Sequence, residues 1–117
     1  FEDACRALEQ AIADHRFGVL HVHAVQKTLA SKGVALGRPV RIFDVCNPQR
    51  AKQALEETPL VAAALPCAIA VLGEGDRAKF VFLRPTVMLG LFHAPALHPM
   101  AEEVEGTVRA IVDQATR

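Results

Sequence analysis

Four stretches of the chain repeat apolar residues at the period of an α-helix. The pattern is strongest over residues 2–15 and 97–115, and both stretches predict amphipathic helices. Residues 25–32 and 48–57 predict two shorter helices. The dipeptide Asn47-Pro48 is typical of a helix start, because Asn caps free backbone N–H groups and Pro is tolerated at the first helical position.

Other stretches show the pattern of strands. Residues 17–24 and 39–46 alternate between two faces, as side chains do along a strand. Residues 67–72 are apolar on both faces and predict an inner strand, and residues 73–76 form a turn into a returning strand at 79–83. Short connections between strands favour a mostly antiparallel sheet with helices packed on one face. The fold class that we predict is therefore α+β, in one domain over residues 1–117.

Residues 84–99 combine three prolines with a cluster of large apolar side chains. The prolines and a glycine predict that regular structure is short here at best. An apolar irregular segment has to be covered by its own domain, by a partner chain or by a ligand. We expect a homodimer, because a chain of 117 residues has little left with which to cover residues 85–92.

Composition narrows the classes of function. The 13 Lys and Arg balance the 13 Asp and Glu, and aromatic residues make up only 5% of the chain, which argues against nucleic-acid binding. The longest apolar run, residues 60–72, is shorter than the roughly 18–20 residues of a membrane span and contains Pro66. Three cysteines cannot all pair within one chain, and this favours a reducing cytoplasm.

Three motifs follow one another at characteristic distances: Cys46-Asn47-Pro48, then Leu65-Pro66-Cys67, then the run from Arg84 to Leu89. This pattern resembles the DUF302 family, a domain of unknown function. The resemblance implies a TATA-binding-protein-like α+β fold that is often dimeric. It also implies a further strand before the first helix, which a sequence beginning at Phe1 would lack. It implies no particular reaction.

Cys46 and Cys67 are candidates for thiol chemistry. Cys46 directly precedes a predicted helix start, where the partial positive charge of the helix favours a thiolate. Cys67 begins the next strand, and the sheet could bring the two sulfur atoms together. They could act as a thiol pair or as ligands of a soft metal or a haem iron. Alternatively, both are small buried residues that fix the turns between strand and helix.

Histidines suggest a second candidate site. His21 and His23 share one face of the strand at 17–24, and imidazole pairs of this kind suit zinc or iron. If this strand pairs with residues 39–46, the same face also carries Asp44 and Cys46. The four side chains could then form a metal site. Alternatively, the histidines lie at a strand edge or in a dimer interface.

We therefore carry three hypotheses of function. The first is a homodimeric module that binds a small ligand where the two cysteine motifs meet the apolar segment 85–92. The second is a thiol-dependent or metal-dependent enzyme, and the third is a structural module that recruits a partner protein. The ligand-binding residues predicted for the first are Cys46, Asn47, Pro48, Pro66, Cys67, Met88 and Phe92.

Overall fold

The computed structural model describes residues 1–117. Helices and strands follow the predicted order closely, with a short α-helix and a short 3-10 helix added in residues 84–99. The elements in chain order are α1 (Glu2–Asp14), β1 (Gly18–Ala24), α2 (Val25–Ser31), β2 (Val40–Cys46), α3 (Pro48–Glu57), the 3-10 helix η1 (Pro59–Ala64), β3 (Cys67–Glu74), β4 (Arg77–Phe82), α4 (Pro85–Gly90), the 3-10 helix η2 (Pro95–Leu97) and α5 (His98–Ala115).

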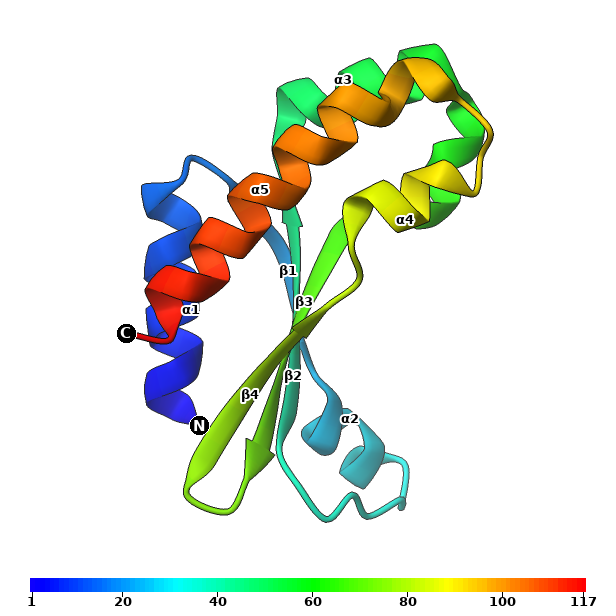
Figure 1. The fold of residues 1–117 in the computed structure, drawn as a ribbon. Coiled ribbons are helices and arrows are strands. Elements are labelled where there is room, and N and C mark those ends of the chain that lie inside the picture. Colours follow the sequence, from blue (N-terminus) through cyan, green and yellow to red (C-terminus); the bar gives the residue numbers. More distant parts are fainter.

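The four strands form one antiparallel sheet in the order β1-β2-β3-β4. Helices α1 and α5 lie side by side on one face of it (Figure 1). Phe43 of β2 and Ile69 of β3 are opposite each other, and both are buried under these helices together with Leu8 and Ile111. These residues belong to a single cluster of 19 buried apolar residues. The predicted α+β architecture with an antiparallel sheet is therefore confirmed.

The second face of the sheet is largely open. The short helix α2 lies against one end of it (Figure 1). Elsewhere this face carries His21 and His23 of β1 and Asp44 of β2. The alternate residues of β3 on this face are also apolar, so the sequence pattern of this strand is apolar on both faces. No helix covers them.

Beyond the end of the sheet, α3, η1, α4 and the first half of α5 form a separate cluster of helices (Figure 1). Residues 84–99 hold only short regular structure, as predicted: the six residues of α4, the three of η2 and the first two of α5. The role that we gave to the prolines is wrong. Pro85, Pro95 and Pro99 each stand in the first two positions of a helix. A proline there loses no intrahelical hydrogen bond, so these prolines begin helices instead of breaking them.

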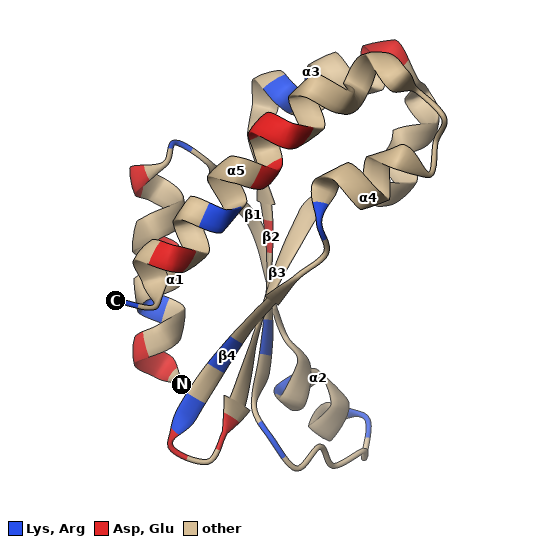
Figure 2. Cartoon of the chain, viewed as in Figure 1, with Lys and Arg blue, Asp and Glu red and all other residues tan.

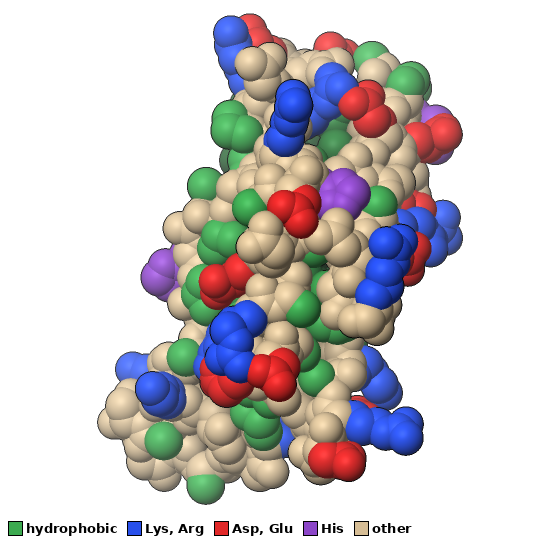
Figure 3. Space-filling model, turned by 90° about the vertical axis from the view of Figure 1, so that its left-hand side faces the viewer, with side chains coloured by type: hydrophobic (Ala, Val, Ile, Leu, Met, Phe, Trp, Pro, Cys, Tyr) green, Lys and Arg blue, Asp and Glu red, His purple; other side chains and the backbone are tan.

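Two segments without charged side chains, residues 58–73 and 85–101, run through this cluster of helices, and the first continues into β3. Figure 2 shows the result as an almost uncoloured region around η1 and α4. By contrast, the face built by α1 and α5 carries side chains of both charges, interspersed with apolar ones (Figure 3). Three large side chains of these two segments are well exposed, Leu60 (72%), Val87 (56%) and Leu91 (71%), and so is Leu83 (70%) just before the second segment; we call these four the apolar end patch.

None of the helices combines the length and the apolar character that a membrane span requires.

Candidate functional site

A narrow apolar cavity lies where the ends of β2 and β3 meet the helix cluster. It is lined by 15 residues, of which 12 are hydrophobic. One wall comes from α3 and η1, and the opposite wall comes from α4 and α5. The lining residues are Phe17, Val45, Cys46, Asn47, Arg50, Ala51, Ala54, Ala64, Leu65, Cys67, Pro85, Met88, Leu89, Met100 and Val104.

The cavity is small. Its volume is about 40 Å³, whereas sites for drug-sized ligands have roughly 300–1,000 Å³. Because one water molecule needs roughly 10–15 Å³ by this measure, the cavity has room for about three waters. Only a molecule of a few non-hydrogen atoms fits, and a porphyrin does not. The cavity therefore offers no place for the haem that we considered from the cysteines.

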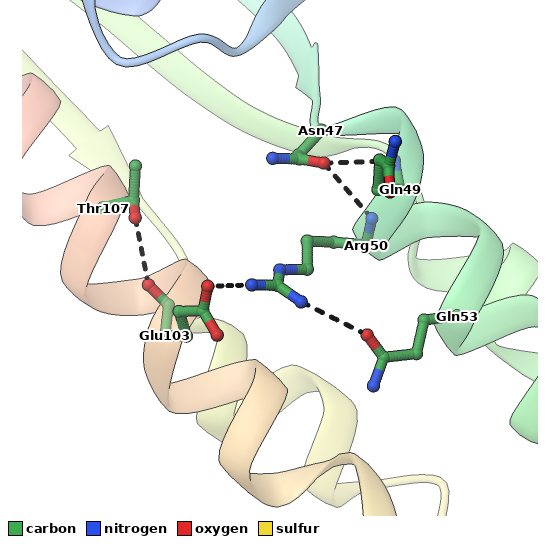
Figure 4. Close-up of polar contacts among 6 residues, drawn as sticks. All are labelled: Asn47, Gln49, Arg50, Gln53, Glu103 and Thr107. Carbon is green, nitrogen blue, oxygen red and sulfur yellow. Dashed lines mark hydrogen bonds and ion pairs between the residues drawn. The ribbon is translucent and has the colours of Figure 1, made fainter.

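Asn47 brings a polar group to this apolar lining. Its side-chain oxygen accepts hydrogen bonds from the backbone N–H groups of Gln49 (3.1 Å) and Arg50 (3.2 Å), so it caps α3 as the sequence predicted. Figure 4 shows this cap at the start of α3. Because the oxygen is held in this way, the amide NH₂ group is left as a pair of donors without a partner in the protein.

Arg50 stands beside Asn47 and joins the two walls. Its guanidinium donates to the Glu103 carboxylate on α5 and also lies 3.4 Å from the Gln53 side-chain oxygen (Figure 4). A second hollow of about 20 Å³ adjoins the cavity here, and Phe17, Asn47, Arg50 and Val104 line both. The polar edge of the site is therefore a neutral ion pair and an amide group.

Cys46 and Cys67 both line the cavity, and neither forms a disulfide bond. Burial raises the pKa of the Cys46 thiol. Burial also raises the pKa of the Cys67 thiol, and the neighbouring Cys46 raises it further. Our expectation that the start of α3 favours a Cys46 thiolate is wrong, because desolvation disfavours the charged form and the Asn47 oxygen already occupies free N–H groups of the helix. Thiol-dependent catalysis is accordingly the weaker alternative.

The structure brings four of the seven predicted ligand-binding residues to this cavity: Cys46, Asn47, Cys67 and Met88. The other three do not line it. Pro48 is exposed in the first turn of α3. Pro66, which follows a cis peptide bond, and Phe92, which packs against the core, are each half-buried elsewhere.

The sequence analysis missed Glu105, which holds α4 against α5. Its carboxylate accepts hydrogen bonds from the Thr86 hydroxyl (2.7 Å) and N–H (3.2 Å) and from Arg84 Nε (3.1 Å). The side chain is only 10% exposed. The hydrogen bond from the Thr86 hydroxyl, with those from its N–H and from Arg84, lowers the pKa of Glu105 to about 2. The sequence does indicate that Glu105 faces inward, since its spacing from Ala101 and Val108 places it on the apolar stripe of α5.

The predicted metal site is assembled only in part. Strands β1 and β2 pair so that His21 lies opposite Asp44, and His23 Nε2 is 2.7 Å from Asp44 Oδ2. Cys46 lines the cavity instead of joining them. No group of three or more His, Cys, Asp or Glu side chains is placed to hold a metal ion. The two histidines and Asp44 are therefore a cluster of their own, apart from the cavity.

Comparison with known proteins finds one family and one fold. Residues 1–115 match the domain of unknown function DUF302. The structure is also similar to the crystal structure of an uncharacterized conserved DUF302 protein from Bacillus stearothermophilus. The two chains have 33% sequence identity and a TM-score of 0.91, over 97% of this chain and 89% of the other. No curated protein matches the sequence.

Proposed function

The chain belongs to the DUF302 family, whose function is unknown, and we propose that it is a binding module for a small uncharged molecule with a carbonyl or hydroxyl oxygen. The observation that carries this proposal is the cavity, in which 12 of the 15 lining residues are hydrophobic. Removing an apolar ligand from water to such a lining is favourable. The size of the cavity limits the enclosed part of the ligand to a few non-hydrogen atoms.

The polar groups select the chemistry of the ligand. The free NH₂ group of Asn47 offers hydrogen-bond donors at the edge of an otherwise apolar site. A ligand with an oxygen acceptor satisfies them. The Arg50 guanidinium is already neutralised by Glu103, so the site has no net charge to attract a carboxylate. A neutral acceptor is therefore preferred over an acid of the same size, which would lose its hydration without gaining a partner.

The proposal is tested by NMR titration of the ¹⁵N-labelled chain with 2-butanone and, separately, with butyrate. We expect saturable shifts with 2-butanone at the backbone amides around Asn47 and at Leu89, and at the side-chain NH₂ group of Asn47. Butyrate should bind more weakly. Ala64→Leu places a larger side chain at the cavity lining and should abolish binding, because Ala64 lines the cavity.

The matched control is Ala63→Leu, which makes the same change at the neighbouring, exposed position of η1. It should bind 2-butanone like the unaltered chain. The proposal fails if the unaltered chain shows no saturable shift with 2-butanone, or if Ala64→Leu and Ala63→Leu bind it equally well.

We propose in addition that the apolar end patch is where two copies of the chain meet. In a two-fold dimer the same surface faces itself, so like charges would repel each other across the axis. The region around Leu60, Val87 and Leu91 lacks charged side chains and avoids this repulsion. A second copy would also bury the apolar surface that Leu60, Val87 and Leu91 expose, and such burial is favourable. The homodimer and the TATA-binding-protein-like arrangement implied by the family both stay predictions.

Sedimentation of the full chain over a range of micromolar concentrations tests the dimer. We expect Leu91→Lys to produce monomers, because it places a charge in the patch of both copies. Leu20→Lys introduces the same charge at an exposed leucine of β1 and should leave the dimer intact. A monomeric unaltered chain, or a dimer that Leu20→Lys disrupts while Leu91→Lys does not, would contradict the proposed interface.

A further inference from the structure

A pair of histidines on the open face of the sheet has no role in the cavity. His21 and His23 are alternate residues of β1, so they project from the same face, and their ring centroids are 4.4 Å apart. Both residues are exposed. The nearest helix, α2, borders a shallow hollow that includes His23, Ile42 and Asp44. Solvent and small ions therefore have direct access to the pair.

Asp44 determines which nitrogen of His23 is available. Its carboxylate lies 2.7 Å from His23 Nε2, and a carboxylate can only accept a hydrogen bond. In the neutral ring the proton therefore sits on Nε2, and Nδ1 carries the free lone pair. The nitrogens of His21 have no hydrogen-bond partner within the protein. The cluster thus offers two imidazole nitrogens as metal ligands, one on the His23 ring, which Asp44 holds in place, and one on the His21 ring, which is free to rotate.

We propose that His21 and His23, through Nδ1 of the latter, bind one divalent transition-metal ion such as Zn²⁺ or Ni²⁺, with Asp44 as the positioning residue for His23. Nitrogen ligands lie about 2.0–2.1 Å from zinc, so two of them on one ion are within about 4 Å of each other. The two ring centroids are 4.4 Å apart, which is close to that separation. Imidazole suits these ions, and water molecules fill the remaining positions.

The role given to Asp44 follows a general feature of metal-binding histidines. Such a histidine usually donates its other ring N–H to a carboxylate or carbonyl, which fixes its tautomer and orientation. The contact between His23 and Asp44 has this geometry already. It assigns Asp44 to positioning the ring, in place of the direct ligand role that the sequence suggested, and it does not involve Cys46.

Calorimetric titration of the metal-free chain with ZnCl₂ or NiCl₂ tests the site. We expect one ion per chain. His21→Ala and His23→Ala should each weaken binding more than about tenfold, since each removes one of two protein ligands. His93→Ala removes an exposed histidine elsewhere and should leave binding unchanged. The inference fails if the unaltered chain binds no ion, if it binds one ion per two chains, or if the His21 and His23 variants bind like His93→Ala.

The positioning role of Asp44 is tested by a measurement that a general loss of structure would not affect in the same way. In Asp44→Ala, the ¹⁵N shifts of the His23 ring should report loss of the hydrogen bond at Nε2, and the affinity should fall roughly 10–100-fold. Asp44→Asn keeps an oxygen acceptor and should restore much of both. If neither the Nε2 shift nor the affinity changes in Asp44→Ala, Asp44 does not position the ring. These outcomes are independent of ligand binding in the cavity.

Discussion

The two walls of the cavity each contain a helix start, and the two are stabilised in different ways. At the start of α3, the side chain of Asn47 caps the backbone N–H groups of Gln49 and Arg50, two and three residues later. At the start of α4, the N–H of Thr86 donates to Glu105, which is 19 residues away on α5. The first helix start is local, whereas the second exists only when α4 and α5 are packed together.

This difference suggests how substitutions in each wall change its stability. The cap of α3 is held by its own residues and resembles the caps of isolated helices. Helix α4 has only six residues, too few to be stable alone, and no cap of its own. Its position, and with it Pro85, Met88 and Leu89 in the cavity wall, therefore depends on packing against α5 and on the hydrogen bonds that the Glu105 carboxylate accepts.

The largest effect that we predict is that of Glu105→Ala. It removes the acceptor for the Thr86 hydroxyl and N–H and the partner of Arg84, so α4 loses its attachment to α5. We expect a larger fall in the midpoint of thermal unfolding than for any other variant discussed here, together with loss of 2-butanone binding. Glu102→Ala, at an exposed position of the same helix, is the control and should change little. Equal midpoints for the two variants would show that α4 does not depend on Glu105.

Acid should weaken the same contact in the unaltered chain. Hydrogen bonds from Thr86 and Arg84 lower the pKa of Glu105 from 4.5 to about 2. Because the pKa is lower in the folded state, the contribution to stability is complete above pH 4.5 and is lost as the pH falls towards 2. Urea unfolding of the chain and of Glu105→Gln at several pH values measures this. The difference in free energy of unfolding should shrink over that interval, and a constant difference would contradict the assignment.

The contrast between the walls also explains which parts of the fold could be predicted. Strands 17–24 and 39–46 were visible because alternation is a local property, and so was the start of α3 at Asn47-Pro48. The hairpin between β3 and β4 was visible for the same reason, since Gly75 takes a positive φ of +62° that favours glycine. Helix α4 was missed because its start depends on a residue of another helix.

The same limit applies to the candidate site: residues that local patterns indicate were predicted, and residues that helix packing brings in were not. Cys46, Asn47 and Cys67 lie at the ends of strands, and sequence alone suggested that they share a region. Arg50 and Val104 line the cavity because α3 and α5 cross near each other, and no local pattern reports this. The acidity of Cys46 was misjudged because the position beside a helix start was visible, whereas its burial was not.

A smaller effect is expected at the other wall. Asn47→Ala removes the cap of α3 and should lower the free energy of unfolding by about 1 kcal/mol, the usual cost of losing an Asn cap. The helix remains held by Ala54, which is buried in the core, so the fold survives. Urea unfolding measures the loss. Gln49→Ala, an exposed position in the same helical turn, should leave the free energy unchanged, and a loss as large as that of Asn47→Ala would assign the effect to the turn in general.

The smallest effect separates the two roles that we give to Asn47. In Asn47→Asp a carboxylate oxygen can still accept from the N–H groups of Gln49 and Arg50, so the cap and the stability should be retained. The two amide donors are lost, and a ligand carbonyl no longer finds a partner. A hydrogen bond contributes about 1 kcal/mol net, so 2-butanone should bind about fivefold more weakly in the NMR titration. Undiminished binding in a stable Asn47→Asp chain would mean that the asparagine serves only the helix, and that the cavity selects its ligand by shape alone.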